Sequence, residues 1–186
     1  MANTVQLSPE ILSVIAAQVS AFWHAVGGEM PREGQAEIGE SFQIWMLTGI
    51  AVVSGATMAE AAPTGRWHHQ VYRQRRPDAH AYSRPIGPGV LDWQLTALFQ
   101  SDVANAINAA VDVVDGAFPG DVEARLLLIP SYGIQCIWVV TGKAHRLVPA
   151  VVPLDYREAV VPFNIYEDHD FLARLRRYPY VQGIVT

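Results

Sequence analysis

EARLLLIPSYGIQCIWVVTGKAHRLVPAVVP, from Glu123 to Pro153, is the stretch that decides the fold. It contains three short runs of large or β-branched apolar residues, 126–129, 134–140 and 147–152. The connections between the runs, Pro-Ser-Tyr-Gly and Thr-Gly-Lys, favour turns because glycine and proline adopt turn geometry readily. Three such runs at close spacing predict an antiparallel meander over residues 124–152.

Upstream of the meander, residues 66–86 predict a β-hairpin. Its two arms are rich in strand-forming residues and enclose a polar loop. Apolar residues at helical spacing and helix-start signals such as Ser8-Pro9-Glu10 predict helices over residues 8–26, 41–60, 90–116 and 166–178. The expected fold is therefore α+β, with a mainly antiparallel sheet of about five strands covered by these helices.

Length, charge and cysteine content limit the classes of protein that this chain can belong to. Its 186 residues suit one buried core, so we expect a single domain over residues 1–186. The net charge of −5 and the scattered basic residues argue against a nucleic-acid partner. Cys136 is the only cysteine, and residues 1–10 lack the features of a signal peptide, which together indicate the cytoplasm.

The charge-free segment 42–59 is the one stretch with the composition of a membrane span. It contains several polar residues and glycines and has no basic flank, so we interpret it as a buried helix and expect no membrane association. The sequence leaves open whether the protein forms a homo-oligomer.

The candidate site lies on the predicted hairpin, where histidines, aromatic residues and arginines gather. If Tyr72 pairs with Ala79, one face of the hairpin carries His69 beside Tyr82, whereas a slip of one residue places His68 there instead. Such a face could bind an anion, hold a metal with a ligand from elsewhere, or position a general base. The candidate ligand- or partner-binding residues are Trp67, His68, His69, His80, Tyr82, Arg84, Arg73, Arg75 and Arg76.

The bland alternative is that these are ordinary strand residues, because the sequence contains no HExxH, CxxC, GxSxG or GxGxxG motif. We therefore expect no metal and no cofactor. Cys136, with His145 or His80 as base, could be a nucleophile, but its apolar strand favours a buried thiol.

Two functions stay open for this chain. The first is a binding or adaptor module that recognises a protein partner or a small-molecule ligand through residues 66–84. The second is a small hydrolase or isomerase that uses His68, His69 or His80, with or without a metal. The sequence leaves open whether the protein is an enzyme.

Overall fold

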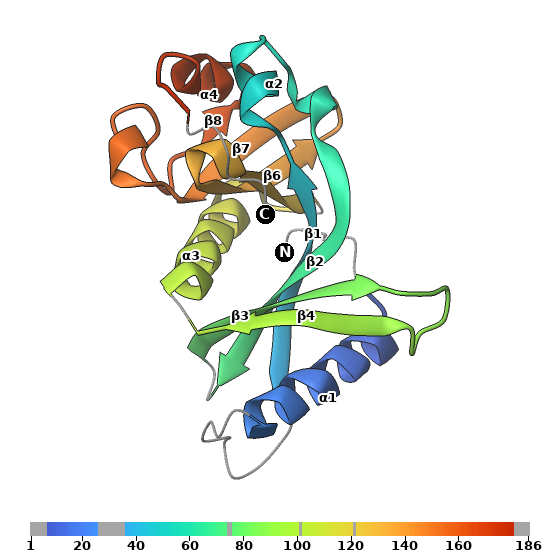
Figure 1. Ribbon diagram of the computed structural model, residues 1–186. Helices are drawn as coiled ribbons and strands as arrows, with labels where there is room; N and C mark the ends of the chain where they lie inside the picture. Colours follow the sequence, from blue (N-terminus) through green and yellow to red (C-terminus); the bar gives the residue numbers. More distant parts are fainter. Residues whose placement is uncertain (1–6, 26–35, 74–75, 101, 121, 181–186) are drawn as a thin grey trace. The chain divides into compact units, whose positions relative to one another are not determined.

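The computed structural model describes residues 7–25, 36–73, 76–100, 102–120 and 122–180 (Figure 1). Within these ranges it contains four α-helices and eight strands, which confirms the α+β class. In chain order the elements are α1 (Pro9–Ala25), β1 (Glu37–Met46), α2 (Gly49–Val53), η1 (Met58–Glu60), β2 (Ala62–Arg73), β3 (Arg76–Pro85), β4 (Trp93–Phe99), α3 (Asp102–Ala117), β5 (Glu123–Ile129), η2 (Pro130–Tyr132), β6 (Ile134–Thr141), β7 (Ala144–Val151), η3 (Leu154–Tyr156), β8 (Tyr166–Glu167) and α4 (Asp168–Leu175), where η marks a single 3-10 turn.

The described strands form one mixed sheet in the order β4-β3-β2-β1-β5-β6-β7-β8. The predicted hairpin is present as the antiparallel pair β2–β3, and the predicted meander as β5–β6–β7. The expected sheet of about five mainly antiparallel strands is wrong in detail. It has eight strands over the described residues, and β1 pairs with β5 in parallel, with Ile44 opposite Leu126.

The helix predicted over residues 41–60 is wrong, because most of its first half belongs to strand β1. Only the five residues of α2 and the single turn η1 are helical there. In β1 the neighbours Ser41 and Phe42 are both buried, so both faces of the strand are covered. A strand covered on both faces reads as an unbroken apolar run, which periodicity alone does not distinguish from a buried helix.

The helix predicted over residues 90–116 is also wrong in its first part, where the structure has strand β4 and then helix α3. Leu91, which falls inside the predicted helix, lies before β4 and is 80% exposed. The sequence Ser-Asp at 101–102 is a helix-start signal, and it separates the strand-forming residues of β4 from the helical residues of α3. The helices predicted over 8–26 and 166–178 are present as α1 and α4 with shorter bounds.

The chain falls into two compact units, and each is described by itself. We call the ranges Val5–Gln43 and Gly65–Asn105 the histidine unit, because they carry the candidate site. The ranges Ile44–Thr64 and Ala106–Thr186 form the meander unit. The expectation of a single domain over residues 1–186 stays a prediction.

In the histidine unit, α1 covers one face of the strands. Ile15, Val19 and Trp23 of the helix form a core with Trp67, Val71 and other apolar residues of β2, β3 and β4. The helix also bonds to the backbone of β4 through Gln18. The side-chain amide of Gln18 donates to the Trp93 carbonyl and accepts from the Leu95 N–H, both at 2.7 Å. Because β4 ends the sheet, Gln18 satisfies backbone groups that would otherwise lack a strand partner.

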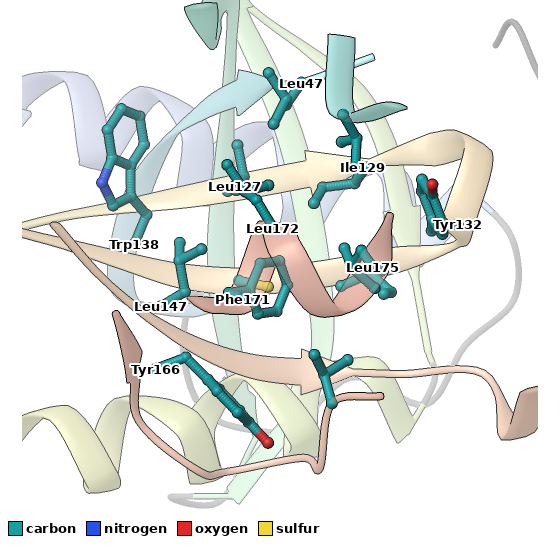
Figure 2. Packing of buried hydrophobic residues seen from close by; sticks show 14 of the residues in the cluster. Leu47, Leu127, Ile129, Tyr132, Trp138, Leu147, Tyr166, Phe171, Leu172 and Leu175 are labelled. Atoms are coloured by element: carbon teal, nitrogen blue, oxygen red, sulfur yellow. The ribbon is translucent and has the colours of Figure 1, made fainter. Parts of the chain in front are cut away.

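In the meander unit, α4 packs against the sheet and closes an apolar core (Figure 2). Phe171, Leu172 and Leu175 of the helix are buried together with residues of β5, β6 and β7. Arg176, directly after α4, donates to the carbonyls of Val52 and Ala56 at 2.8 and 2.7 Å. This arginine therefore ties α4 to the end of α2.

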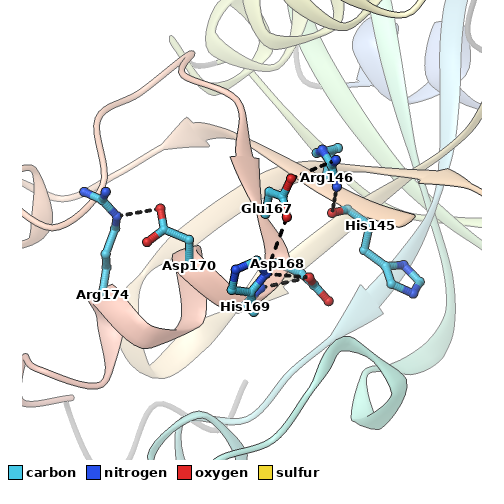
Figure 3. Close-up of polar contacts among 7 residues, drawn as sticks. All are labelled: His145, Arg146, Glu167, Asp168, His169, Asp170 and Arg174. Atoms are coloured by element: carbon cyan, nitrogen blue, oxygen red, sulfur yellow. Dashed lines mark hydrogen bonds and ion pairs between the residues drawn. The ribbon is translucent and has the colours of Figure 1, made fainter. Parts of the chain in front are cut away.

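The polar side of the same region is held by ion pairs at β8 and α4 (Figure 3). Arg146 of β7 contacts Glu167 of β8 at 3.0 Å across the strand pair, and Arg174 contacts Asp170 at 2.9 Å one helical turn away. Exposed pairs of this kind contribute about 0–1 kcal/mol each, so they orient β8 and α4 more than they stabilise them.

The contact between Gln18 and strand β4 yields a prediction about stability. Gln18→Ala leaves the Trp93 carbonyl and the Leu95 N–H without their partner, so we expect the free energy of unfolding to fall by about 1–3 kcal/mol. Urea unfolding followed by circular dichroism measures this change. Gln100→Ala, at an exposed position just after β4, is the matched control and should change the value by less than about 0.5 kcal/mol. Equal values for the two variants would contradict a role for the Gln18 amide.

Candidate functional site

The register of the β2–β3 hairpin decides which histidine lies beside Tyr82. His68 pairs with Tyr82, His69 with Ala81, and Gln70 with His80. Val71, not Tyr72, stands opposite Ala79, and the register changes by one residue at an irregularity between Val71 and Tyr72. The expected register is therefore wrong by one residue, and the slipped alternative, with His68 on the face of Tyr82, is the one observed.

One face of the hairpin carries a cluster of aromatic rings around His68, which we call the His68 face. Its members are Phe42, His68, Gln70, His80, Tyr82 and Phe99. The His68 and His80 rings are stacked, with centroids 5.3 Å apart and planes 19° apart. His80 in turn stacks on Phe99 of β4 at 5.2 Å and 27°. Phe99 is 47% exposed, so it is the outermost ring of this stack.

His68 is fully buried, and among the described residues neither of its ring nitrogens has a hydrogen-bond partner. Its neighbour Gln70 is equally buried and donates from Nε2 to the Ala104 carbonyl at 3.1 Å, which fixes the amide orientation. Within the same described ranges the Gln70 Oε1 atom lacks a partner as well. Each such buried polar group costs about 1–3 kcal/mol when it stays unpaired. Two residues of β2 on the His68 face, His68 and Gln70, therefore carry polar atoms without a hydrogen-bond partner among the described residues.

Burial keeps the histidines of this face uncharged. Burial lowers the pKa of His68 well below its ordinary value, and the neighbouring His80 and His69 lower it further. Burial also lowers the pKa of His80 to about 4 and raises the pKa of Tyr82. At neutral pH the rings therefore offer neutral donors and acceptors and no positive charge.

The opposite face of the hairpin carries His69, and both of its ring nitrogens lie at hydrogen-bond distance from a serine hydroxyl. His69 Nδ1 lies 2.8 Å from Ser41 Oγ, and Nε2 lies 2.7 Å from Ser83 Oγ. A neutral imidazole has one N–H and one acceptor nitrogen, so one serine accepts from the ring and the other donates to it. Burial lowers the pKa of His69 to about 3. Trp67 lies on the same face, in the core under α1, and the centroids of the Trp67 and Trp93 rings are 6.1 Å apart.

Ser83, His69 and Ser41 have the connectivity of a nucleophile, a base and an orienting group. All three are buried, with exposed fractions of 0%, 0% and 6%. The Ser83 hydroxyl is therefore not presented to a substrate in this conformation, and the chain of hydrogen bonds acts as an internal clamp between β1, β2 and β3.

The predicted arginines do not join the histidines. Arg84 is exposed, and its guanidinium donates to the Gln94 side chain at 3.4 Å. Arg73 and Arg76 pair through the backbone, but their side chains, like the whole of Arg75, lie outside what the structure describes. An acidic partner for this loop stays a prediction.

Cys136 lies at the centre of the meander core and is fully buried. Burial raises the pKa of its thiol far above the ordinary value, so the thiolate that a nucleophile requires is disfavoured. His145, the expected base, instead accepts at Nδ1 from Trp138 Nε1 at 3.1 Å. This geometry fits the interpretation of Cys136 as a buried apolar side chain.

Three members of the His68 face were not found from the sequence. Phe42 and Phe99 belong to strands in segments that the sequence predicts as helices, and Gln70 is a polar residue between His69 and Val71 with no motif around it. For Phe99, alternation of apolar residues from Trp93 onward was the available signal. For Gln70, the signal was its place two residues after His68, on the same face of a strand.

The comparisons with known proteins give no family. No protein-family model, no curated protein and no solved structure matches this chain. Among the described residues no group of three or more histidine, cysteine, aspartate or glutamate side chains is placed to hold a metal ion. No helix within the described ranges has the length and apolar character needed to cross a membrane.

The buried histidines predict a loss of stability in mild acid. Below about pH 6.5 the unfolded chain protonates His69, whereas the folded protein does not until about pH 3, so stability falls over this window by about 1.4 kcal/mol per pH unit. Above about pH 6.5 His69 is neutral in both the folded and the unfolded protein, so its contribution to the free energy of unfolding is fully present. Urea unfolding between about pH 7 and pH 4 measures the slope.

His69→Gln should reduce that slope by about 1.4 kcal/mol per pH unit, because one depressed titration is removed. His169→Gln is the matched control, since the His169 side chain is 76% exposed and stays in water in both states. Equal slopes for His69→Gln and the unchanged protein would show that His69 is hydrated in the folded state.

Proposed function

We propose that this protein is a binding module for a small, neutral, flat molecule, which it takes up on the His68 face. The observation that carries the proposal is the fully buried His68, whose two ring nitrogens lack partners among the described residues. Natural proteins seldom leave such groups unpaired, and the exceptions mark functional sites or bound water. A ligand with its own donor and acceptor would recover the hydrogen bonds that folding removes from His68 and Gln70.

The neutrality of the ligand follows from the electrostatics of the face. Burial depresses the pKa of both His68 and His80, so neither ring offers a positive charge to an anion. A carboxylate or phosphate would lose its hydration without gaining an ion pair. An amide or an uncharged heterocycle presents donors and acceptors without this cost.

The flat shape follows from the rings. Phe42, His68, His80, Tyr82 and Phe99 form a continuous set of ring contacts with centroid distances from 5.2 to 6.4 Å. Planar groups gain stacking energy in such surroundings. Phe99, as the outermost ring, is the member of this set that an arriving molecule would meet first.

A small ligand is favoured over a protein partner because four of the six candidate residues whose side chains the structure describes are covered. Trp67, His68, His69 and His80 are each less than 9% exposed, so a protein docking on the hairpin would not touch them. The alternative of a histidine-dependent hydrolase rests on the Ser83–His69–Ser41 chain. It is the weaker candidate because both ring nitrogens of His69 are already engaged within the fold, whereas those of His68 have no partner among the described residues.

Benzamide and benzoate test the proposal, since they share a ring and differ in charge. We expect benzamide to shift the NMR signals of His68, His80 and Phe99, with a dissociation constant of about a millimolar, as befits a fragment of this size. Benzoate should bind at least about tenfold more weakly. His68→Phe should abolish benzamide binding, while Leu91→Ser, in the exposed turn between β3 and β4, should leave it unchanged.

Two results would overturn the proposal. One is benzamide failing to bind, or binding no better than benzoate. The other is undiminished benzamide binding by His68→Phe, because the ring nitrogens would then have no part in recognition.

A further inference from the structure

A second feature, confined to the meander unit, lies in the segment that follows β7. Residues 159–165, Ala-Val-Val-Pro-Phe-Asn-Ile, contain no charged side chain. Three of them expose large apolar side chains at alternate positions: Val161 is 47% exposed, Phe163 40% and Ile165 42%. Such side chains are ordinary when single, but a run of three marks a contact surface.

The backbone at Phe163 is strained. Among the described residues it is the one non-glycine residue with a positive φ, 65°. Pro162 precedes it, and the Asn164 N–H donates to the Val161 carbonyl at 3.4 Å, which is the pattern of a type II turn. The third position of that turn favours glycine or asparagine, because a side chain there crowds the backbone. Phenylalanine at this position costs conformational energy, and burial offsets only part of what a fully buried ring would, because 40% of the residue stays exposed.

Bonds from the fold hold the turn in place. The Phe163 N–H donates to the Pro149 carbonyl of β7 at 2.8 Å, and the Val161 N–H donates to the Tyr166 hydroxyl at 2.8 Å. Tyr166 is itself buried against Phe171 of α4. The turn is therefore fixed before any partner arrives, which lowers the entropy that binding must remove.

The turn between β3 and β4 shows that exposed apolar residues do not require such strain. There Ile86 and Leu91 are exposed at 63% and 80%, but the turn itself is made of Gly87, Pro88 and Gly89. Asp92 accepts from the Gly89 N–H at 2.9 Å and closes this turn. Strain combined with a displayed aromatic ring is thus a property of the Phe163 turn alone within the described residues.

The charges next to the Phe163 turn are of both signs. Asp155, Arg157 and Glu158 are exposed, and the backbone bond from Val160 N–H to the Tyr156 carbonyl keeps them in the same compact loop. No ion pair joins these three side chains to any other side chain in the described ranges. Two copies of the loop facing each other can therefore pair Arg157 of one with an acidic side chain of the other.

We propose that the Phe163 turn, residues 161–165, is the surface through which two copies of this chain associate about a twofold axis. An apolar centre with both charges beside it is self-complementary, and a twofold contact requires the same patch to meet itself. Phe163 lies at the centre, where a rigid aromatic ring contributes most to an interface. This contact is independent of ligand binding on the His68 face.

Sedimentation velocity on the full chain, from about 5 to about 500 µM, tests the proposal. We expect a monomer–dimer equilibrium for the unchanged protein. Phe163→Gly should weaken the dimer at least about tenfold, while the dilute monomer stays folded because relief of the strained turn offsets burial lost with the ring. Leu91→Ser, which removes a more exposed apolar side chain elsewhere, should leave the dimer intact.

Glu158→Arg provides a second variant that does not touch the turn. It should weaken the dimer at least about threefold, because two like charges then face each other across the twofold axis. A monomer at all concentrations would overturn the proposal and would leave another protein, or the end of this chain, as the occupant of the surface. Full dimerisation by Phe163→Gly would overturn it as well.

Discussion

The histidine unit depends on one constraint: two consecutive imidazoles on strand β2 point to opposite faces of a sheet that is covered on both sides. His69 meets this constraint with two serine hydroxyls at hydrogen-bond distance. His68 meets aromatic rings instead, and its nitrogens stay unpaired among the described residues. The same residue type, one position apart, is therefore a structural clamp on one face and an unsatisfied group on the other. Unsatisfied buried groups oppose folding, so the two histidines contribute to the stability of this unit with opposite sign.

Local sequence patterns predicted the antiparallel pairs β2–β3 and β5–β6–β7 and failed at β1 and β4, whose segments were predicted as helices. The meander and the hairpin were visible because their turns carry glycine, proline and polar residues between apolar arms. β1 was hidden because Phe42 and Ile44 continue without charge into the apolar residues of α2. The parallel pairing of β1 with β5 joins segments about eighty residues apart in the sequence, which no local pattern encodes.

The candidate site residues stay a prediction, but the structure shows where they lie. The clustered histidines and Tyr82 lie on the predicted hairpin, as strands β2 and β3, and alternation places His68 and His69 on opposite faces. The register changes by one residue at an irregularity between Val71 and Tyr72, and no local pattern in the sequence marks that position. Burial could not be inferred either, because Phe42 and Phe99 come from segments that resembled helices. A histidine that looked available for docking is in fact enclosed.

The stability of two neighbouring variants tests the central claim most directly. Replacing His68 by phenylalanine keeps a flat ring and removes two unpaired nitrogens, so the free energy of unfolding should rise by about 1–3 kcal/mol. Replacing His69 by phenylalanine leaves Ser41 and Ser83 without their partner, so the value should fall by about 2 kcal/mol or more. Destabilisation of similar size in both variants would contradict the account, because His68 would then be bonded in the folded protein as His69 is.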